Sequence, residues 1–227
     1  YITDNINVSD KSVANVDLGL VNDNVFDMKL DATVEKMTIQ NNSESTEFNS
    51  NGSKLAKVDI NPELVDGSKV LVEYKITVTN QGYIPGTINK IVDYMTDSME
   101  FDSSLNSAWY QESDGNVYTR ALKDDVINPG ESRELTLVLI KNMTAENTGL
   151  VHNSFEIVDA INDKGIADID STPDNGLDED DLSSADCIIG VSTGVHMTTV
   201  FAISGGIVTT IVLIALVVFI VEKRRYV

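Results

Sequence analysis

Residues 70–79, Val-Leu-Val-Glu-Tyr-Lys-Ile-Thr-Val-Thr, alternate between two kinds of side chain over most of their length. One set is apolar or aromatic and contains Val70, Val72, Tyr74, Ile76 and Val78, whereas the intervening residues from Glu73 onward are polar. A period of two is typical of a β-strand with one buried face, because a helix would repeat every 3.6 residues. This stretch therefore predicts a strand whose apolar face lies against a core.

Working outward from this strand, similar alternation or strand-like composition occurs in six further segments. They are residues 25–39, 54–60, 87–95, 133–140, 151–157 and 184–192. The links between them carry turn residues; in Asn128-Pro129-Gly130-Glu131, proline and glycine occupy the positions that a type II turn favours. Strands that alternate and are separated by turns predict an all-β fold, an antiparallel β-sandwich over residues 25–190. Residues 101–115 show no clear period, so strands there are not placed.

A second feature of the sequence is an uncharged run of 22 residues at 200–221, VFAISGGIVTTIVLIALVVFIV. As a helix it would be about 33 Å long, which is enough to cross a hydrocarbon layer of about 30 Å. We therefore expect one transmembrane helix whose partner is the lipid bilayer. The tail 222–227 holds Lys223, Arg224 and Arg225, whereas residues 186–199 hold no Lys or Arg. The positive-inside rule places the C-terminus in the cytoplasm and the preceding domain outside the cell membrane.

The composition excludes several classes of function. The chain has 16 Lys and Arg against 36 Asp and Glu, a net charge of −20, so nucleic acid is not an expected partner. The single cysteine, Cys187, rules out an internal disulfide framework and a Cys-based zinc site. No catalytic or phosphate-binding glycine motif occurs. We therefore expect no enzymatic activity, no catalytic residues and no small-molecule substrate.

The acidic residues concentrate late in the domain. Residues 159–186 contain ten Asp and Glu side chains and one lysine, Lys164. Oxygen-rich loops of this kind can bind Ca²⁺, which takes six to eight oxygen ligands, although the sequence around Asp168 does not follow the EF-hand pattern. The alternative is a solvated acidic loop before the last strand. No other cofactor or metal is expected.

Several short motifs are similar to a known family. They are YKITVTNQG (74–82), INKIVDYM (88–95), NPGESRELTLVL (128–139), HNSFEI (152–157) and the acidic DIDSTPDN followed by DEDDLSSAD (168–186). Together they resemble the repeat domain of unknown function found in surface proteins of Gram-positive, Firmicutes- or Clostridia-like bacteria. The resemblance implies an immunoglobulin-like sandwich that forms a stalk between an exposed tip and the cell envelope.

The same resemblance raises the question of an internal Lys–Asn isopeptide bond, which some sandwich families form with the help of a buried acid. Asn153 shares a strand face with Phe155 and Ile157, and Asp93 is a candidate acid. Lys36 is the candidate amine only if the first strand keeps its phase beyond Val34. The alternative is an ordinary core in which Asn153 is satisfied by the backbone.

Three functions remain open at this point. The first is a non-catalytic, membrane-anchored extracellular spacer, with residues 1–24 as the tail of a preceding region and 191–199 as a juxtamembrane stalk. The second is an adhesin-type module that binds a glycan or host protein through Trp109 and its neighbouring tyrosines. The alternative for Trp109, which we favour, is that it closes one end of the core. The third is a sortase-processed protein; residues 190–194 keep the Thr-Gly of a sorting signal but lack its Leu-Pro.

Overall fold

The computed structural model describes residues 23–42, 44–96 and 98–192, and these contain β-strands and no helix. In chain order the strands are β1 (Met28–Asn41), β2 (Glu44–Ser53), β3 (Leu55–Ile60), β4 (Lys69–Asn80), β5 (Thr87–Asp93), β6 (Glu100–Phe101), β7 (Trp109–Gln111), β8 (Val117–Thr119), β9 (Ser132–Asn142), β10 (Gly149–Val151), β11 (Ser154–Ile161), β12 (Leu182–Ser184) and β13 (Asp186–Val191). The prediction of an all-β fold is therefore confirmed for the described residues.

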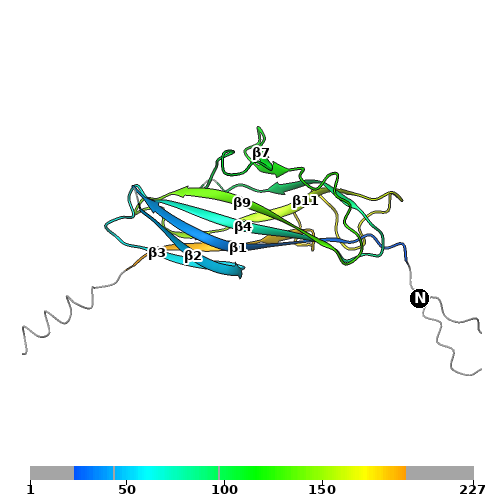
Figure 1. Ribbon diagram of the computed structural model, residues 1–227, viewed down its shortest axis with the longest axis horizontal. Helices are drawn as coiled ribbons and strands as arrows, with labels where there is room; N and C mark the ends of the chain where they lie inside the picture. The colour runs from blue at the N-terminus through cyan, green and yellow to red at the C-terminus, as the bar shows by residue number, and fades with distance from the viewer. Residues whose placement is uncertain (1–22, 43, 97, 193–227) are drawn as a thin grey trace, which may run out of the picture.

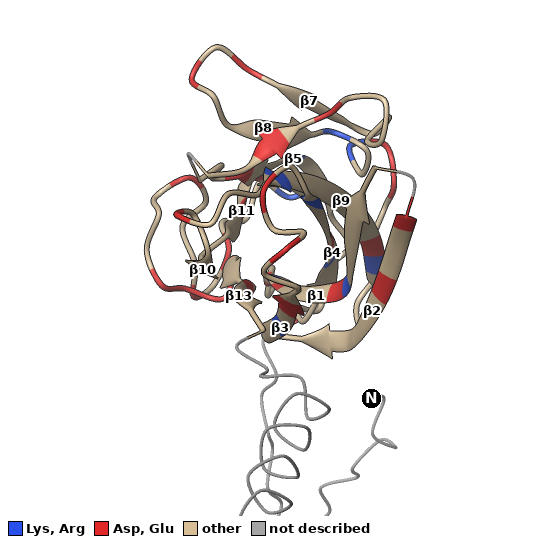
Figure 2. Cartoon of the chain, turned by 90° about the vertical axis from the view of Figure 1, so that its left-hand side faces the viewer, with Lys and Arg blue, Asp and Glu red and all other residues tan. Residues whose placement is uncertain are grey.

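The strands form three sheets that enclose one core (Figures 1 and 2). One sheet has the order β2-β1-β4-β9-β6, and facing it lie the sheets β12-β11-β5-β8-β7 and β10-β13-β3. Almost all pairs are antiparallel, as the sequence predicts. The exception is β13, which runs parallel to β3 from Asp186 opposite Leu55 to Val191 opposite Ile60. A strand at the end of the domain thus returns beside one from its beginning, which a local sequence pattern does not reveal.

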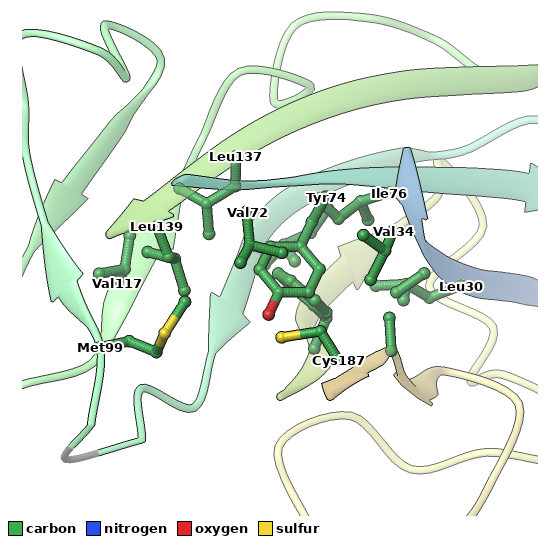
Figure 3. Close-up of a cluster of buried hydrophobic side chains, with 14 of the residues drawn as sticks. Leu30, Val34, Val72, Tyr74, Ile76, Met99, Val117, Leu137, Leu139 and Cys187 are labelled. Carbon is green, nitrogen blue, oxygen red and sulfur yellow. The ribbon is translucent and has the colours of Figure 1, made fainter. Parts of the chain in front are cut away.

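The core follows the alternation that defines β4. Its apolar set, Val70, Val72, Tyr74, Ile76 and Val78, is fully buried. Leu137 and Leu139 of β9 and Val34 of β1 pack on the same side, and Figure 3 shows the Tyr74 hydroxyl pointing toward Cys187 of the facing layer. Burial of these side chains supplies the main driving force for the fold.

A bulge in β1 decides which of its side chains reach this core. Leu30, Ala32 and Val34 are buried in alternation, and the register with β4 then shifts between Val34 and Lys36. After the bulge Met37 is buried and Lys36 faces outward, because one extra residue reverses the inward and outward phase of a strand.

The chain enters and leaves the sandwich at opposite ends (Figure 1). Met28 pairs with Asn80 at the last residue of β4. Ser192 instead donates its backbone N–H to the carbonyl of Ile60, beside the segment that leads into the first residue of β4. Because β4 has 12 residues, about 36 Å separate these two ends at the strand rise of about 3.3 Å per residue.

Several predictions fall outside the described residues, including the span 200–221, the basic tail and residues 1–22. Within the described residues no helix is long and apolar enough to cross a membrane.

The turn at Asn128–Glu131 has the expected form: Gly130 has a φ of 78°, and the Glu131 N–H donates to the Asn128 carbonyl at 2.9 Å.

Candidate metal centre

Four carboxylates from different parts of the chain converge at the end of the sandwich where the chain enters. Asp27 precedes β1, and Asp168, Asp170 and Asp180 belong to the acidic loop between β11 and β12. One oxygen of each lies within 4.8 Å of one oxygen of every other. Four potential oxygen ligands therefore surround a single point.

Backbone hydrogen bonds hold these segments together. The Ile169 N–H donates to the Phe26 carbonyl at 3.0 Å, and the Leu30 N–H donates to the Asp180 carbonyl at 2.8 Å. Asp168 also accepts a hydrogen bond from the Met28 N–H at 2.7 Å through its Oδ2 atom. The cluster is thus built on main-chain contacts between β1 and the loop and does not depend on side-chain rotamers alone.

The electrostatics of the cluster are unfavourable without a counter-charge. No salt bridge joins any of the four carboxylates to Lys or Arg among the described residues. Burial, followed by repulsion from Asp170, raises the pKa of Asp27. The same causes raise the pKa of Asp180 to about 6, and Lys29 offsets only part of the effect. One oxygen of Asp27 and one of Asp180 are buried without a hydrogen-bond partner.

This arrangement can relieve its repulsion in two ways. It can hold a proton, as the raised pKa values of Asp27 and Asp180 indicate, or it can bind a hard cation that prefers carboxylate oxygens. Ca²⁺ fits the donor set, because four carboxylates leave positions for water or carbonyl oxygens in a shell of six to eight ligands. The sequence had pointed to the acidic loop, and three of the four carboxylates lie in it.

A neighbouring group of acids lies deeper. Glu156 is fully buried, and its Oε1 accepts hydrogen bonds from the backbone N–H groups of Asn175 and Gly176 at 2.8 and 2.9 Å. Asp181 is 1% exposed and has no partner for either oxygen. Burial and the nearby Glu156 raise the pKa of Asp181 to about 7. These residues anchor the acidic loop to β11, so the loop is a packed element of the domain.

The candidate isopeptide residues are only partly brought together. Asp93 and Asn153 are both buried in the core, as the sequence predicts, and none of their side-chain polar atoms has a hydrogen-bond partner. Burial raises the pKa of Asp93 well above its usual value, and the nearby Asn153 amide offsets part of this shift. The assignment of Lys36 as the amine is wrong. The bulge in β1 turns it outward, where its Nζ lies 3.5 Å from carboxylate oxygens of Glu47 and Glu73.

A different lysine is buried. Lys141 of β9 is 3% exposed, because it continues the inward series of Leu137 and Leu139. Desolvation lowers its pKa. The sequence carries a signal for this burial, because the alternation of Leu137 and Leu139 continues to Lys141. This residue lies one position beyond the predicted segment 133–140.

The structure also places the other residues that the sequence singled out. Trp109 is 4% exposed, and its Nε1–H donates to the Thr136 carbonyl at 2.8 Å, so it closes the core and is not an exposed binding platform. Cys187 is buried, and burial raises the pKa of its thiol to about 11. His152 is exposed, and its Nδ1 lies 2.8 Å from Asp186.

Comparison with known proteins finds similarity of structure only. No protein-family model and no curated protein matches the chain. Among solved structures, the crystal structure of the CARDB domain of the PF1109 protein from Pyrococcus furiosus, a complex with di-metal ions, is 13% identical. It aligns over 73% of this chain and 90% of that chain with a TM-score of 0.34. The solution NMR structure of the same domain is 14% identical over 73% and 98% of the two chains, with a TM-score of 0.32.

Proposed function

We propose that this chain is a non-catalytic spacer that stands on the outer face of a cell membrane and is anchored through residues 200–221. The observation that carries the proposal is the position of the two chain ends. Residues that precede β1 and residues that follow β13 leave from opposite ends of the sandwich, so the domain adds its full length between whatever precedes it and the bilayer (Figure 1).

The geometry gives this spacer a length. The long strands β1, β4 and β9 run along the axis that joins the two ends, and β4 alone contributes about 36 Å. Backbone hydrogen bonds between these three strands, interrupted in β1 by the single bulge, resist extension along that axis. The high negative charge keeps neighbouring copies apart and soluble.

We extend the proposal to the acidic cluster, which in our account binds Ca²⁺. A cation held by Asp27 on one side and by Asp168, Asp170 and Asp180 on the other would tie the start of β1 to the acidic loop. The positive charge of the ion would then offset the repulsion between carboxylates that raises the pKa of Asp180. The role of the ion is mechanical, since it stiffens the end of the domain that faces the preceding part of the chain.

The sortase alternative has less support. Gly190 and Val191, which stand where a sorting signal would have Leu and Pro, are the last residues of β13 and pair with Asp59 and Ile60. A peptide that must be read in an enzyme groove would first have to leave this ladder. We therefore favour a retained membrane helix.

The spacer geometry can be tested by a distance measurement. Spin labels on Asp23→Cys and Ser192→Cys, in a Cys187→Ala background, should report a separation of about 36 Å or more by electron–electron dipolar spectroscopy. A doubly labelled protein with a mean separation below about 20 Å would place both chain ends on one side and overturn the proposal.

The cation site can be tested independently by thermal unfolding. A ligand at 100 times its Kd stabilises the folded state by about 2.7 kcal/mol, which raises the Tm of a domain of this size by about 5–11 °C. We expect this rise with Ca²⁺ and its loss in Asp180→Asn. The control Asp124→Asn removes an acid whose side chain is 89% exposed and outside the cluster, and it should behave like the wild type. An unchanged Tm in saturating Ca²⁺ would remove the ion from the account.

A further inference from the structure

A pocket with a different chemistry lies on the outer side of the sheet β12-β11-β5-β8-β7. It has a volume of about 360 Å³, within the range of small-ligand sites, and it opens to solvent. Its walls are formed by Asn89, Lys90, Arg120, Lys123, Val158 and Asp159. Three cationic side chains thus gather around one hollow of a chain whose net charge is −20.

Two tyrosines of the β7–β8 hairpin hold two of these cations in place. The Lys90 Nζ lies 3.7 Å from the centroid of the Tyr118 ring, and the Arg120 Nε–H donates to the Tyr110 hydroxyl at 3.1 Å. The two rings lie 6.2 Å apart. A cation that rests on an aromatic ring or a fixed hydroxyl loses less rotamer freedom when it binds a ligand, so this wall is preorganised.

The charges of the three cations are not equally available. The Lys90 Nζ lies 3.0 Å from Oε1 of Glu112, so its charge is largely balanced by that carboxylate. The Lys123 Nζ lies 3.8 Å from Oδ2 of the exposed Asp124. Among the described residues Arg120 forms no salt bridge with a carboxylate. Arg120 therefore offers the guanidinium fork that suits a carboxylate or a phosphate group, and Lys123 supports it.

The remaining walls select for more than charge. Asp159 accepts a hydrogen bond from the Asn89 amide at 2.9 Å, which fixes both side chains at the edge of the pocket. The other Asp159 oxygen and the Asn89 carbonyl are acceptors for hydroxyl groups, whereas Val158 offers a small apolar surface. Hydroxyl donors, one apolar face and one oxyanion occur together on an acidic sugar.

We propose that this pocket binds a single acidic sugar unit of a glycan, with Arg120 and Lys123 on its oxyanion and Asp159 and Asn89 on its hydroxyl groups. The oxyanion is either a uronate carboxylate or a sugar phosphate. This function is additional to that of the spacer and does not depend on the cation cluster.

The test uses the full 227-residue chain in detergent micelles and saturation-transfer NMR with three probes. They are trigalacturonic acid, its fully methyl-esterified neutral form, and galactose 6-phosphate. We expect at least one anionic probe to bind at least fivefold more tightly than the neutral trimer, and the anionic probe that binds identifies the oxyanion. Higher salt should weaken this binding, because the site is exposed to solvent.

Variants locate the binding. Arg120→Gln should lower the affinity at least fivefold, whereas the matched control Lys57→Gln, on β3 of another sheet, should leave it unchanged. An unchanged Tm for both variants shows that the fold is intact. The proposal is overturned if no probe binds at 10 mM, if the neutral trimer binds equally well, or if Arg120→Gln binds like the wild type.

Discussion

Replacing Asp93 by asparagine should make the domain more stable at neutral pH. The Asp93 carboxyl group is fully buried beside Asn153, and neither of its oxygens has a hydrogen-bond partner. Burial raises its pKa in the folded state well above 3.8. Asparagine has nearly the same shape, carries no charge at any pH, and can donate a hydrogen bond to the Asn153 side chain.

The magnitude follows from proton linkage. Above pH 4 the unfolded chain loses the Asp93 proton, whereas the folded domain keeps it up to its raised pKa. Each pH unit in this window therefore lowers the free energy of unfolding by about 1.4 kcal/mol for this one group. Between pH 5 and pH 7 the wild type should lose up to about 2.7 kcal/mol through Asp93, and Asp93→Asn should lose none of this share.

Urea unfolding of residues 23–192 at pH 5, 6 and 7 measures the effect. Asp27, Asp180 and Asp181 also have raised pKa values, but they are present in both proteins and cancel in the difference. We expect the stability advantage of Asp93→Asn to grow with pH, and an exposed control, Asp124→Asn, to show no such trend. A difference that does not change with pH, or an Asp93→Asn variant that is less stable at pH 7, would refute the reasoning.

Three further predictions concern the core. Leu137→Asp should unfold the domain, because an unpaired charge at this fully buried position costs about 3 kcal/mol or more; circular dichroism would show the loss of sheet. Gly86→Ala should lower the Tm, since a Cβ atom there would lie 2.4 Å from a Phe26 ring carbon and 2.8 Å from the Ile161 carbonyl oxygen. Cys187 should react with iodoacetamide only after the domain unfolds, because it is buried and its thiol pKa is about 11; rapid labelling of the native protein would contradict this.

The long strands could be predicted because one of their faces is buried. The alternation in residues 70–79 corresponds to β4, and similar patterns located β1, β3, β5, β9 and β13. Strand β2 was missed, because most of its residues are exposed on both faces and it therefore lacks an apolar period. The short strands β6, β7 and β8 contain two or three residues each, which is too few to show a period.

The candidate site could be predicted only in part. The density of acids in residues 159–186 pointed to three members of the cluster, but Asp27 lies more than 130 positions earlier in the sequence. The parallel bridge between Phe26 and Asp168, together with the hydrogen bonds from Met28 to Asp168 and from Leu30 to Asp180, brings it there. The same limit applies to Lys36, whose orientation depends on the bulge between Val34 and Lys36.

The central claim, an anchored spacer with its domain outside the cell, is tested most directly by cysteine labelling of intact cells that express the protein. Cys187 is buried and should not react in the folded protein. A cysteine at Leu150→Cys therefore reports on the exposed surface of the domain, and a cysteine at Tyr226→Cys, in a second protein, reports on the basic tail. We predict that a membrane-impermeant maleimide labels the Leu150→Cys protein on intact cells and the Tyr226→Cys protein only after the membrane is permeabilised. Labelling of the tail on intact cells, or protection of the domain until lysis, would contradict the account.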